Sequence, residues 1–168
     1  MTLLFIAIIE CITAAIIICS RRAQRRDWRP LSVLSSLIAM FFFLALDLDP
    51  TKNVLPENIG VALQIAGLAF QLYAKLSLGR SFGVLPATRA LVSHGAYRWL
   101  RHPIYFGYLI AHIGFLLCNF SLRNFAVMAV LYVAQIIRIE REEEMLSTLP
   151  GYPEYRNSVR YRLIPGIY

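Results

Sequence analysis

The chain has 168 residues, of which 58% are hydrophobic and only 16% are charged, and its formal net charge is +7. Soluble domains carry roughly 25% charged residues, and several apolar runs here reach the roughly 20 residues that cross a bilayer. These values exclude a soluble globular domain and predict an integral membrane protein whose partner is the lipid bilayer. Basic loops in such a protein indicate which side of the membrane they face, so the positive charge predicts no nucleic-acid partner.

The N-terminal half is predicted to contain three membrane-spanning helices. Residues 3–20 form the first span, which only Glu10 interrupts. An acidic side chain at that depth is costly, so we expect it to face other helices. Five arginines between residues 21 and 30 form the first basic loop. The second span covers residues 31–48, and the third covers residues 58–78 after a short polar turn.

The third span carries two patterns along its length. Small residues, which would let a neighbouring helix approach closely, are Gly60, Ala62, Ala66, Gly67 and Ala69. Gln64, Gln71 and Lys75 stand one or two helical turns apart and form a polar stripe on one face. We expect the Lys75 side chain to extend along the helix to the membrane interface.

The C-terminal half is predicted to add two spans. Residues 104–119 form the fourth and residues 125–139 form the fifth, and the brief turn 120–124 makes them an antiparallel helical hairpin. His112 within the fourth span is expected to be a packing group. The predicted fold class is therefore all-α, a polytopic membrane protein with five transmembrane helices and a cytoplasmic C-terminal segment.

The orientation follows from the distribution of basic residues. Most of the seventeen lie in the loops 21–30 and 79–103 and in the tail after residue 137, while the opposite connections contribute only Lys52 and Arg123. The positive-inside rule then predicts an N-terminus outside and a C-terminus in the cytoplasm, in the inner (cytoplasmic) membrane. The three cysteines lie in or at the end of apolar runs without metal-ligand spacing, so we expect neither a metal nor a disulfide.

Two polar segments on the predicted cytoplasmic side are candidates for function. Residues 91–107 are basic and aromatic, and Pro103 within them suits the first turn of a helix, so a helix is expected to begin there. The free N–H groups of that first turn would favour an anion. In the tail, Arg138 and Glu142 are four residues apart and share a helical face. Each segment alone is also compatible with a loop that fixes topology and a surface salt bridge.

An ordered set of residues runs through both segments. It consists of Leu78-Gly79-x-x-Phe82, Leu91-Val92-x-x-Gly95-x-Tyr97-Arg98, Arg101-His102-Pro103-x-Tyr105-x-Gly107, Arg138 with Glu142 and Glu143, Gly151 with Glu154 and Tyr155, and Arg162-Leu163-Ile164-Pro165-Gly166. In order and spacing this set resembles the isoprenylcysteine carboxyl methyltransferase family and its phospholipid N-methyltransferase relatives. The resemblance covers residues 78–168, whereas the N-terminal spans carry no matching motif.

The resemblance implies an enzyme that uses S-adenosylmethionine at the cytoplasmic face of the membrane. By this likeness the cofactor-binding residues are Tyr97, Arg101, His102, Tyr105, Gly107 and Glu143, and the catalytic pair is Arg138 and Glu142. It also implies a division into residues 1–77, which hold the first three helices, and residues 78–168, which form the methyltransferase core, within a single structural unit.

The residue types agree with this chemistry. A sulfonium methyl donor is already activated, so transfer depends mainly on placing the acceptor in line with it, and the faces of Tyr97 and Tyr105 can hold its cation. Arg138 can orient an acceptor carboxylate. Glu142 would then hold Arg138, or take a proton if the acceptor is an amine or hydroxyl. A lipophilic small molecule or a prenylated substrate would enter from the bilayer.

Three other functions stay open at this point. A phospholipid or amine N-methyltransferase would use the same cofactor. A membrane reductase would need a nicotinamide site, although no GxGxxG motif is present. A non-catalytic transport protein would use Glu10, Gln64, Gln71 and His112 as a polar path, although no internal repeat is visible.

Overall fold

The computed structural model describes residues 11–16, 18–20, 23, 25–47, 54–83, 87–88 and 90–167. Its helices are α2 (Pro30–Phe41), α3 (Glu57–Leu78), α4 (Pro103–Cys118), α5 (Leu122–Leu146) and α6 (Tyr152–Ser158), with short 3-10 turns η1 (Phe42–Ala45), η2 (Gly79–Ser81) and η3 (Gly95–Arg98). Residues 11–16 are also helical. The two-residue strands β1 (Arg25–Arg26) and β2 (Ala87–Thr88) pair antiparallel, with Arg25 opposite Thr88. The described part of the chain is thus all-α apart from this one short β pairing.

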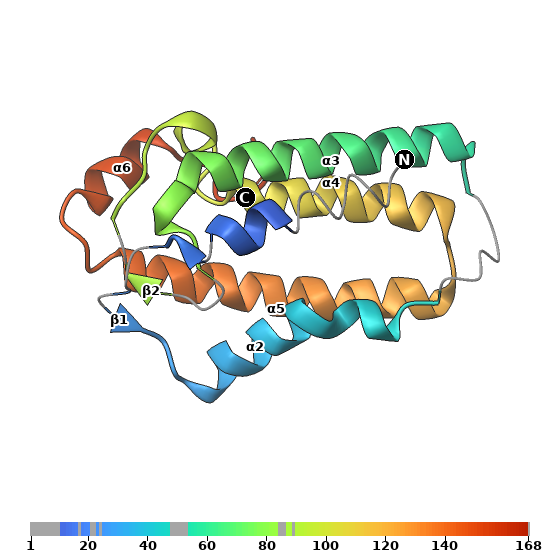
Figure 1. Ribbon diagram of the computed structural model, residues 1–168, viewed down its shortest axis with the longest axis horizontal. Helices are drawn as coiled ribbons and strands as arrows, with labels where there is room; N and C mark the ends of the chain where they lie inside the picture. The colour runs from blue at the N-terminus through green and yellow to red at the C-terminus, as the bar shows by residue number, and fades with distance from the viewer. Residues whose placement is uncertain are drawn as a thin grey trace.

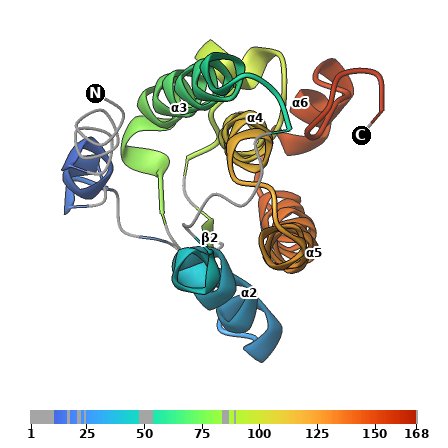
Figure 2. The ribbon, with the colours of Figure 1, turned by 90° about the vertical axis from the view of Figure 1, so that its right-hand side faces the viewer.

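The helices form an elongated bundle in which α3 lies along α4 and α2 lies along α5 (Figures 1 and 2). The predicted hairpin is confirmed in its short connection, because α5 begins at Leu122 and Ser121 caps it by accepting a hydrogen bond from the Asn124 amide at 3.0 Å. Its packing differs from the expectation. Helix α4 makes its long contact with α3 and a much smaller contact with α5, in which His112 Nδ1 lies 3.0 Å from the Tyr132 hydroxyl.

Glycines on both helices explain why α4 packs against α3. A Cβ placed on Gly67 would lie 2.4 Å from the backbone nitrogen of Ala111, and one placed on Gly114 would lie 2.5 Å from the backbone oxygen of Gly60. Side chains at these positions would push the two backbones apart, so the glycines permit the close contact. The small residues Gly60 and Gly67 thus act as predicted, whereas Ala62, Ala66 and Ala69 are exposed on the outer face of α3.

Two helical segments, Glu57–Ser81 and Leu122–Leu146, are long and apolar enough to cross a membrane within the described part of the chain. The apolar segments Pro30–Ala45 and Pro103–Cys118 are shorter. Large exposed apolar side chains on α2, α3 and α5 include Leu34, Leu37, Ile65, Leu76, Val130 and Val133. Most of the predicted first span, with Glu10, falls outside the described residues, so the five-span topology stays a prediction.

The prediction that Lys75 extends to the interface is wrong. Its residue is only 1% exposed, and its Nζ donates a hydrogen bond to Thr13 Oγ1 at 2.8 Å. The Nζ atom also lies 5.8 Å from the centroid of the Tyr108 ring. The helical segment 11–16 supplies Thr13, so the Lys75 ammonium group finds its partners inside the bundle.

The polar connections gather at one end of the bundle, where α6 also lies (Figure 1). There the segment before α2 is ordered by Asp27, which accepts hydrogen bonds from the Arg29 amide at 3.0 Å and from Ser32 Oγ at 2.6 Å. Burial alone would raise the pKa of Asp27, but hydrogen bonds from Arg29 and Ser32 outweigh it and lower the pKa to about 2. Arg29 in turn forms a two-bond ion pair with Glu144 of α5, at 3.0 and 2.9 Å.

Candidate active site

The loop before α4 and the C-terminal tail are joined by backbone hydrogen bonds. The Arg101 amide donates to the Tyr161 carbonyl at 3.0 Å, and the His102 amide donates to the Arg162 carbonyl at 2.9 Å. His102 is the N-cap residue of α4, and Pro103 occupies the first turn as predicted. These contacts place the side chains of Arg101 and His102 between α4, α5 and the tail.

Glu143 of α5 is the centre of the buried charges. Its Oε1 atom lies 2.7 Å from Arg101 Nε and 3.2 Å from His102 Nε2, and its Oε2 atom lies 3.2 Å from Arg162 Nε. The side chains of Glu143, Arg101 and His102 are 8%, 6% and 3% exposed. Buried charges persist only when they are paired in this way.

Glu142 lies beside Glu143 and connects the same loop to Arg138. Its Oε1 atom accepts a hydrogen bond from the Tyr105 hydroxyl, and its Oε2 atom lies 3.6 Å from His102 Nδ1. Arg138 Nη2 lies 3.9 Å from Glu142 Oε1, and its guanidinium carbon lies 5.7 Å from the centroid of the Tyr105 ring. Glu142, Glu143, His102, Tyr105 and Arg138 form one contiguous group, which we call the polar cluster.

The environment of His102 favours its charged form. Burial by itself would lower the pKa of His102, but hydrogen bonds and charge interactions with Glu142 and Glu143 outweigh burial and raise that pKa above its usual value. Both ring nitrogens face carboxylate oxygens, and only the imidazolium can donate from both. His102 therefore ties the two glutamates together.

Tyr97 and Gly107 are each explained in part by packing. Tyr97 is buried in η3, where its carbonyl accepts a hydrogen bond from the Tyr155 hydroxyl at 2.8 Å, and burial raises the pKa of its phenol well above the usual value. A Cβ on Gly107 would lie 2.8 Å from the backbone nitrogen of Gln71 in α3. Their roles at a cofactor stay predictions.

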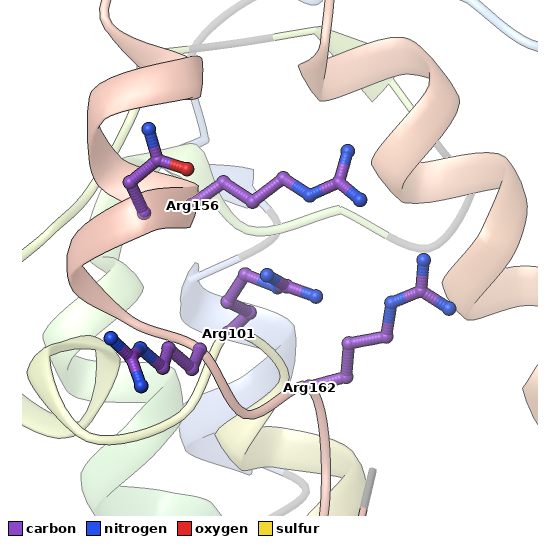
Figure 3. Close-up of a pocket in the computed structure, with 5 residues that line it drawn as sticks. Arg101, Arg156 and Arg162 are labelled. Carbon is purple, nitrogen blue, oxygen red and sulfur yellow. The ribbon is translucent and has the colours of Figure 1, made fainter.

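Two cavities adjoin the polar cluster. One of about 350 Å³ is lined by Glu140, Glu143, Glu144, Ser147, Tyr152, Arg156 and Arg162. The Tyr152 hydroxyl is buried beside Glu143, and burial together with the charge and hydrogen bonding of Glu143 raises its pKa to about 12. The other, of about 640 Å³, is lined by Arg101, Arg156, Asn157, Arg160 and Arg162 (Figure 3).

The structure brings six of the eight predicted residues into direct contact and adds others that the sequence reasoning assigned no role. Arg138, Glu142, Arg101, His102, Tyr105 and Glu143 are linked by the contacts given above. Arg162 belongs to the closing motif of the sequence set, yet nothing in its spacing indicated a bond to Glu143. Tyr152 and Arg156 lie on α6 and line a cavity together with residues of α5. No sequence pattern indicated that α6 would lie beside α5.

Comparison with known proteins places these residues in context. A model of the phospholipid methyltransferase family matches residues 56–151. Protein-S-isoprenylcysteine O-methyltransferase A of Arabidopsis thaliana is 39% identical over 113 residues, which are 61% of this chain and 56% of that protein. Protein-S-isoprenylcysteine O-methyltransferase B of the same plant is 34% identical over 139 residues, which are 77% of this chain and 68% of that protein.

A solved structure is similar as well. The eukaryotic intramembrane Ras methyltransferase, an isoprenylcysteine carboxyl methyltransferase, matches with a TM-score of 0.54 and 29% identity. The match covers 84% of this chain and 54% of that one. This chain thus spans between about half and two thirds of the length of these relatives. The apolar helices and this neighbour together identify an integral membrane protein.

Proposed function

Starting from the finding that the chain belongs to the phospholipid methyltransferase family, together with the protein-S-isoprenylcysteine O-methyltransferases, we propose that it transfers a methyl group from S-adenosylmethionine to a lipophilic acceptor. The preferred acceptor is a carboxylate, as in the isoprenylcysteine enzymes, so the product would be a methyl ester. The observation that carries this proposal is the polar cluster, in which motif residues far apart in sequence meet within a few ångströms.

The residues beside the cluster fit S-adenosylmethionine. The cavity of about 350 Å³ next to Glu143 falls within the roughly 300–1,000 Å³ of small-ligand pockets. Its carboxylates Glu140, Glu143 and Glu144 suit the ammonium and ribose hydroxyl groups of the cofactor, and the Tyr152 hydroxyl in the same lining offers a further hydrogen-bonding group. When bound, the cofactor supplies an activated methyl group on a sulfonium centre.

The residues of the polar cluster divide into orienting and supporting groups. Arg138 presents a guanidinium fork that suits an acceptor carboxylate, and Glu142 restrains it through the contact at 3.9 Å. Tyr105 fixes Glu142 by its hydrogen bond and places its ring under the Arg138 guanidinium. A carboxylate acceptor carries no proton to remove, because the acceptor oxygen forms the new C–O bond while the C–S bond breaks. Placement is therefore the main task of these side chains.

His102 is assigned a supporting role in this proposal. Both of its ring nitrogens face the glutamates, so a direct bond to the cofactor carboxylate would require one of these contacts to break. The Arg101 side chain is held in the same way by Glu143. Tyr97 and Gly107 complete the proposed cofactor-binding set at the first turns of α4 and at η3.

The proposed orientation places the polar cluster in the cytoplasm, with the N-terminus outside. In the sequence, fourteen of the seventeen basic residues lie in residues 21–30, residues 79–103 and the tail after residue 137, while Lys52 and Arg123 lie in the opposite connections. Such an asymmetry is what the positive-inside rule requires of the inner membrane. A prenylated cysteine or another isoprenoid or lipid acid would then reach Arg138 with its carboxylate at the surface and its apolar tail in the bilayer.

An N-methyltransferase is the second candidate, because the matching family model is that of phospholipid methyltransferases. An amine acceptor must lose a proton, and Glu142 is the carboxylate nearest to Arg138 in the polar cluster. The two candidates differ in product, since a base-labile methyl ester is formed in one and a base-stable methylamine in the other.

The test combines cofactor binding with product analysis. Purified protein should bind S-adenosylhomocysteine in the micromolar range, and membranes incubated with a radiolabelled methyl donor should yield a labelled, base-labile product in the lipid phase. Arg138→Ala should abolish labelling and leave binding nearly unchanged, whereas His102→Ala should weaken binding. Arg141→Ala is the matched control, because among the described residues Arg141 forms its ion pair with the exposed Glu144, three positions further along α5. Stabilisation by NADPH and none by S-adenosylhomocysteine would refute the proposal.

A further inference from the structure

The cavity of about 640 Å³ beside α6 is lined almost entirely by arginine. Its lining comprises Arg101, Arg156, Arg160 and Arg162 with Asn157, and no acidic residue of the described chain lines it. In Figure 3 the guanidinium groups of Arg101, Arg156 and Arg162 lie around one opening. We call this cavity the arginine cleft. Arg156 and Arg162 also line the cavity proposed for the cofactor, and Arg101 contacts Glu143. Arg160 and Asn157 are the lining residues that the methyl-transfer proposal does not use.

The arginine cleft has a surplus of positive charge. Glu143 lies behind it and contacts Arg101 at 2.7 Å and Arg162 at 3.2 Å. Arg156 and Arg160 are exposed and form no ion pair or hydrogen bond within the described part of the chain. The Glu143 carboxylate thus contacts two of the four guanidinium groups, and like charges brought together in this way repel unless an anion joins them.

The geometry of the lining selects the kind of anion. Guanidinium groups present paired donors that match the oxygens of a phosphate, and several of them can share one phosphate because it has more acceptors than a carboxylate. The Asn157 side chain adds a neutral amide donor at the same opening. The volume of the cleft is larger than one phosphate needs, so the phosphate can carry further polar groups.

The position of the cleft indicates where such a phosphate would come from. The residue between Arg160 and Arg162 is Tyr161, which is 42% exposed, and Trp99, two residues before Arg101, is 54% exposed. Exposed aromatic residues of this kind lie at the headgroup level of membranes. Phospholipid phosphates lie at that same level, and anionic lipids concentrate at the cytoplasmic surface.

We propose that the arginine cleft binds the phosphate of an anionic phospholipid headgroup at the membrane surface beside the polar cluster. The site would hold the end of α6 and the tail against the bilayer, next to the opening through which a lipophilic acceptor arrives. Binding of the lipid needs no methyl transfer, so this inference can be tested separately from the proposed activity.

Lipid retention by the full chain in neutral detergent is the measurement. Native mass spectrometry of protein with added dioleoylphosphatidylglycerol should show a bound lipid, whereas dioleoylphosphatidylcholine should compete poorly. The variant Arg160→Gln should weaken phosphatidylglycerol binding about 5-fold for the one cation removed, and Arg160 does not line the cavity proposed for the cofactor. The control Arg98→Gln removes one exposed arginine elsewhere and should leave binding within about twofold, because Arg98 does not line the cleft.

The outcomes separate the possible ligands. Equal phosphatidylglycerol binding by the cleft variant and the wild type would overturn the proposal. Displacement of the lipid by inorganic phosphate at the same concentration would overturn the assignment to a headgroup and favour a soluble phosphate. Loss of S-adenosylhomocysteine binding in the cleft variant, with lipid binding unchanged, would instead assign the cleft to the cofactor. The proposal would be supported if the wild type prefers phosphatidylglycerol, the variant loses this preference, and both proteins bind S-adenosylhomocysteine equally well.

Discussion

Replacing Glu143 by glutamine is the sharpest test of how the polar cluster is held together. The substitution keeps the shape of the side chain but removes the charge that Arg101 and His102 contact at 2.7 and 3.2 Å. Both cations are more than nine-tenths buried and would lose a counter-charge. Breaking a buried ion pair costs about 3–5 kcal/mol, and we take about 3 kcal/mol because Glu143 also borders a cavity. For a chain of this length that loss lowers the unfolding midpoint by about 6–12 °C.

Thermal unfolding in detergent, followed by intrinsic fluorescence, measures this effect, and S-adenosylhomocysteine titration measures the accompanying loss of binding. The matched control is Glu144→Gln, because Glu144 is the next residue of α5 and also contacts two arginines, Arg29 and Arg141. Its side chain is 53% exposed, so water replaces the lost charge and the midpoint should hardly move. Equal midpoint shifts in the two variants would refute the view that Glu143 is the centre of a buried charge network.

Three further predictions concern packing and pH. Gly67→Ala should destabilise the protein by about 1–3 kcal/mol because the added methyl group meets the α4 backbone at 2.4 Å, whereas Ala66→Leu on the exposed face should be nearly neutral in the same unfolding assay. The lowered pKa of Asp27, about 2, means that its stabilising effect is complete above pH 4 and is lost as the pH falls toward 2. Acid unfolding of Asp27→Asn should therefore show less pH dependence in that interval. The raised pKa of His102 has the opposite sign, because its contribution is complete below about pH 6.5 and is lost as the pH rises through the folded-state pKa. His102→Gln should remove that alkaline loss, and an unchanged pH profile would contradict it.

The helices and the existence of the polar cluster follow from patterns that the sequence carries. The length of the apolar run predicted the third span as residues 58–78, one residue short of α3 at its N-terminal end, and Pro103 predicted the start of α4. The family resemblance of the ordered motifs predicted that Arg101 and His102 share a site with Glu142 and Glu143, and the structure places these residues in contact. These features depend on local sequence or on a family resemblance, and both can be recognised in the amino-acid sequence alone.

Helix partners were harder to predict. Periodicity and length indicate that a helix is apolar, but they do not indicate which neighbour it packs against, so the contact between α3 and α4 through Gly67 and Gly114 was not predicted. The fifth membrane span was predicted to end at residue 139 with the helix continuing past Arg138 to Glu142, and α5 does continue, to Leu146. The turns of α5 after residue 139 extend beyond its apolar part and are charged. They bring Glu142 and Glu143 into contact with His102 in the loop before α4.

Lys75 shows a different limit of sequence reasoning. A lysine near the end of an apolar helix has a long stem that usually reaches water, and nothing nearby in sequence contradicts that outcome. Its partner Thr13 lies 62 positions earlier, on a helix whose placement only the fold reveals. Polar pairs between residues far apart in sequence cannot be predicted from the local periodicity of either helix.

The close contact between α3 and α4 has a consequence for the proposed chemistry. Helix α4 holds His102 at its N-cap and Tyr105 one turn later, whereas α5 holds their partner Glu142. The contact of α4 with α5 is much smaller than its contact with α3. The position of α4 must then be set mainly by α3, through glycines such as Gly67. A family match that begins at residue 56, and so includes all of α3, agrees with this dependence. Side chains that widen the α3–α4 contact should therefore displace Tyr105 from Glu142 and reduce methyl transfer without touching any residue of the polar cluster.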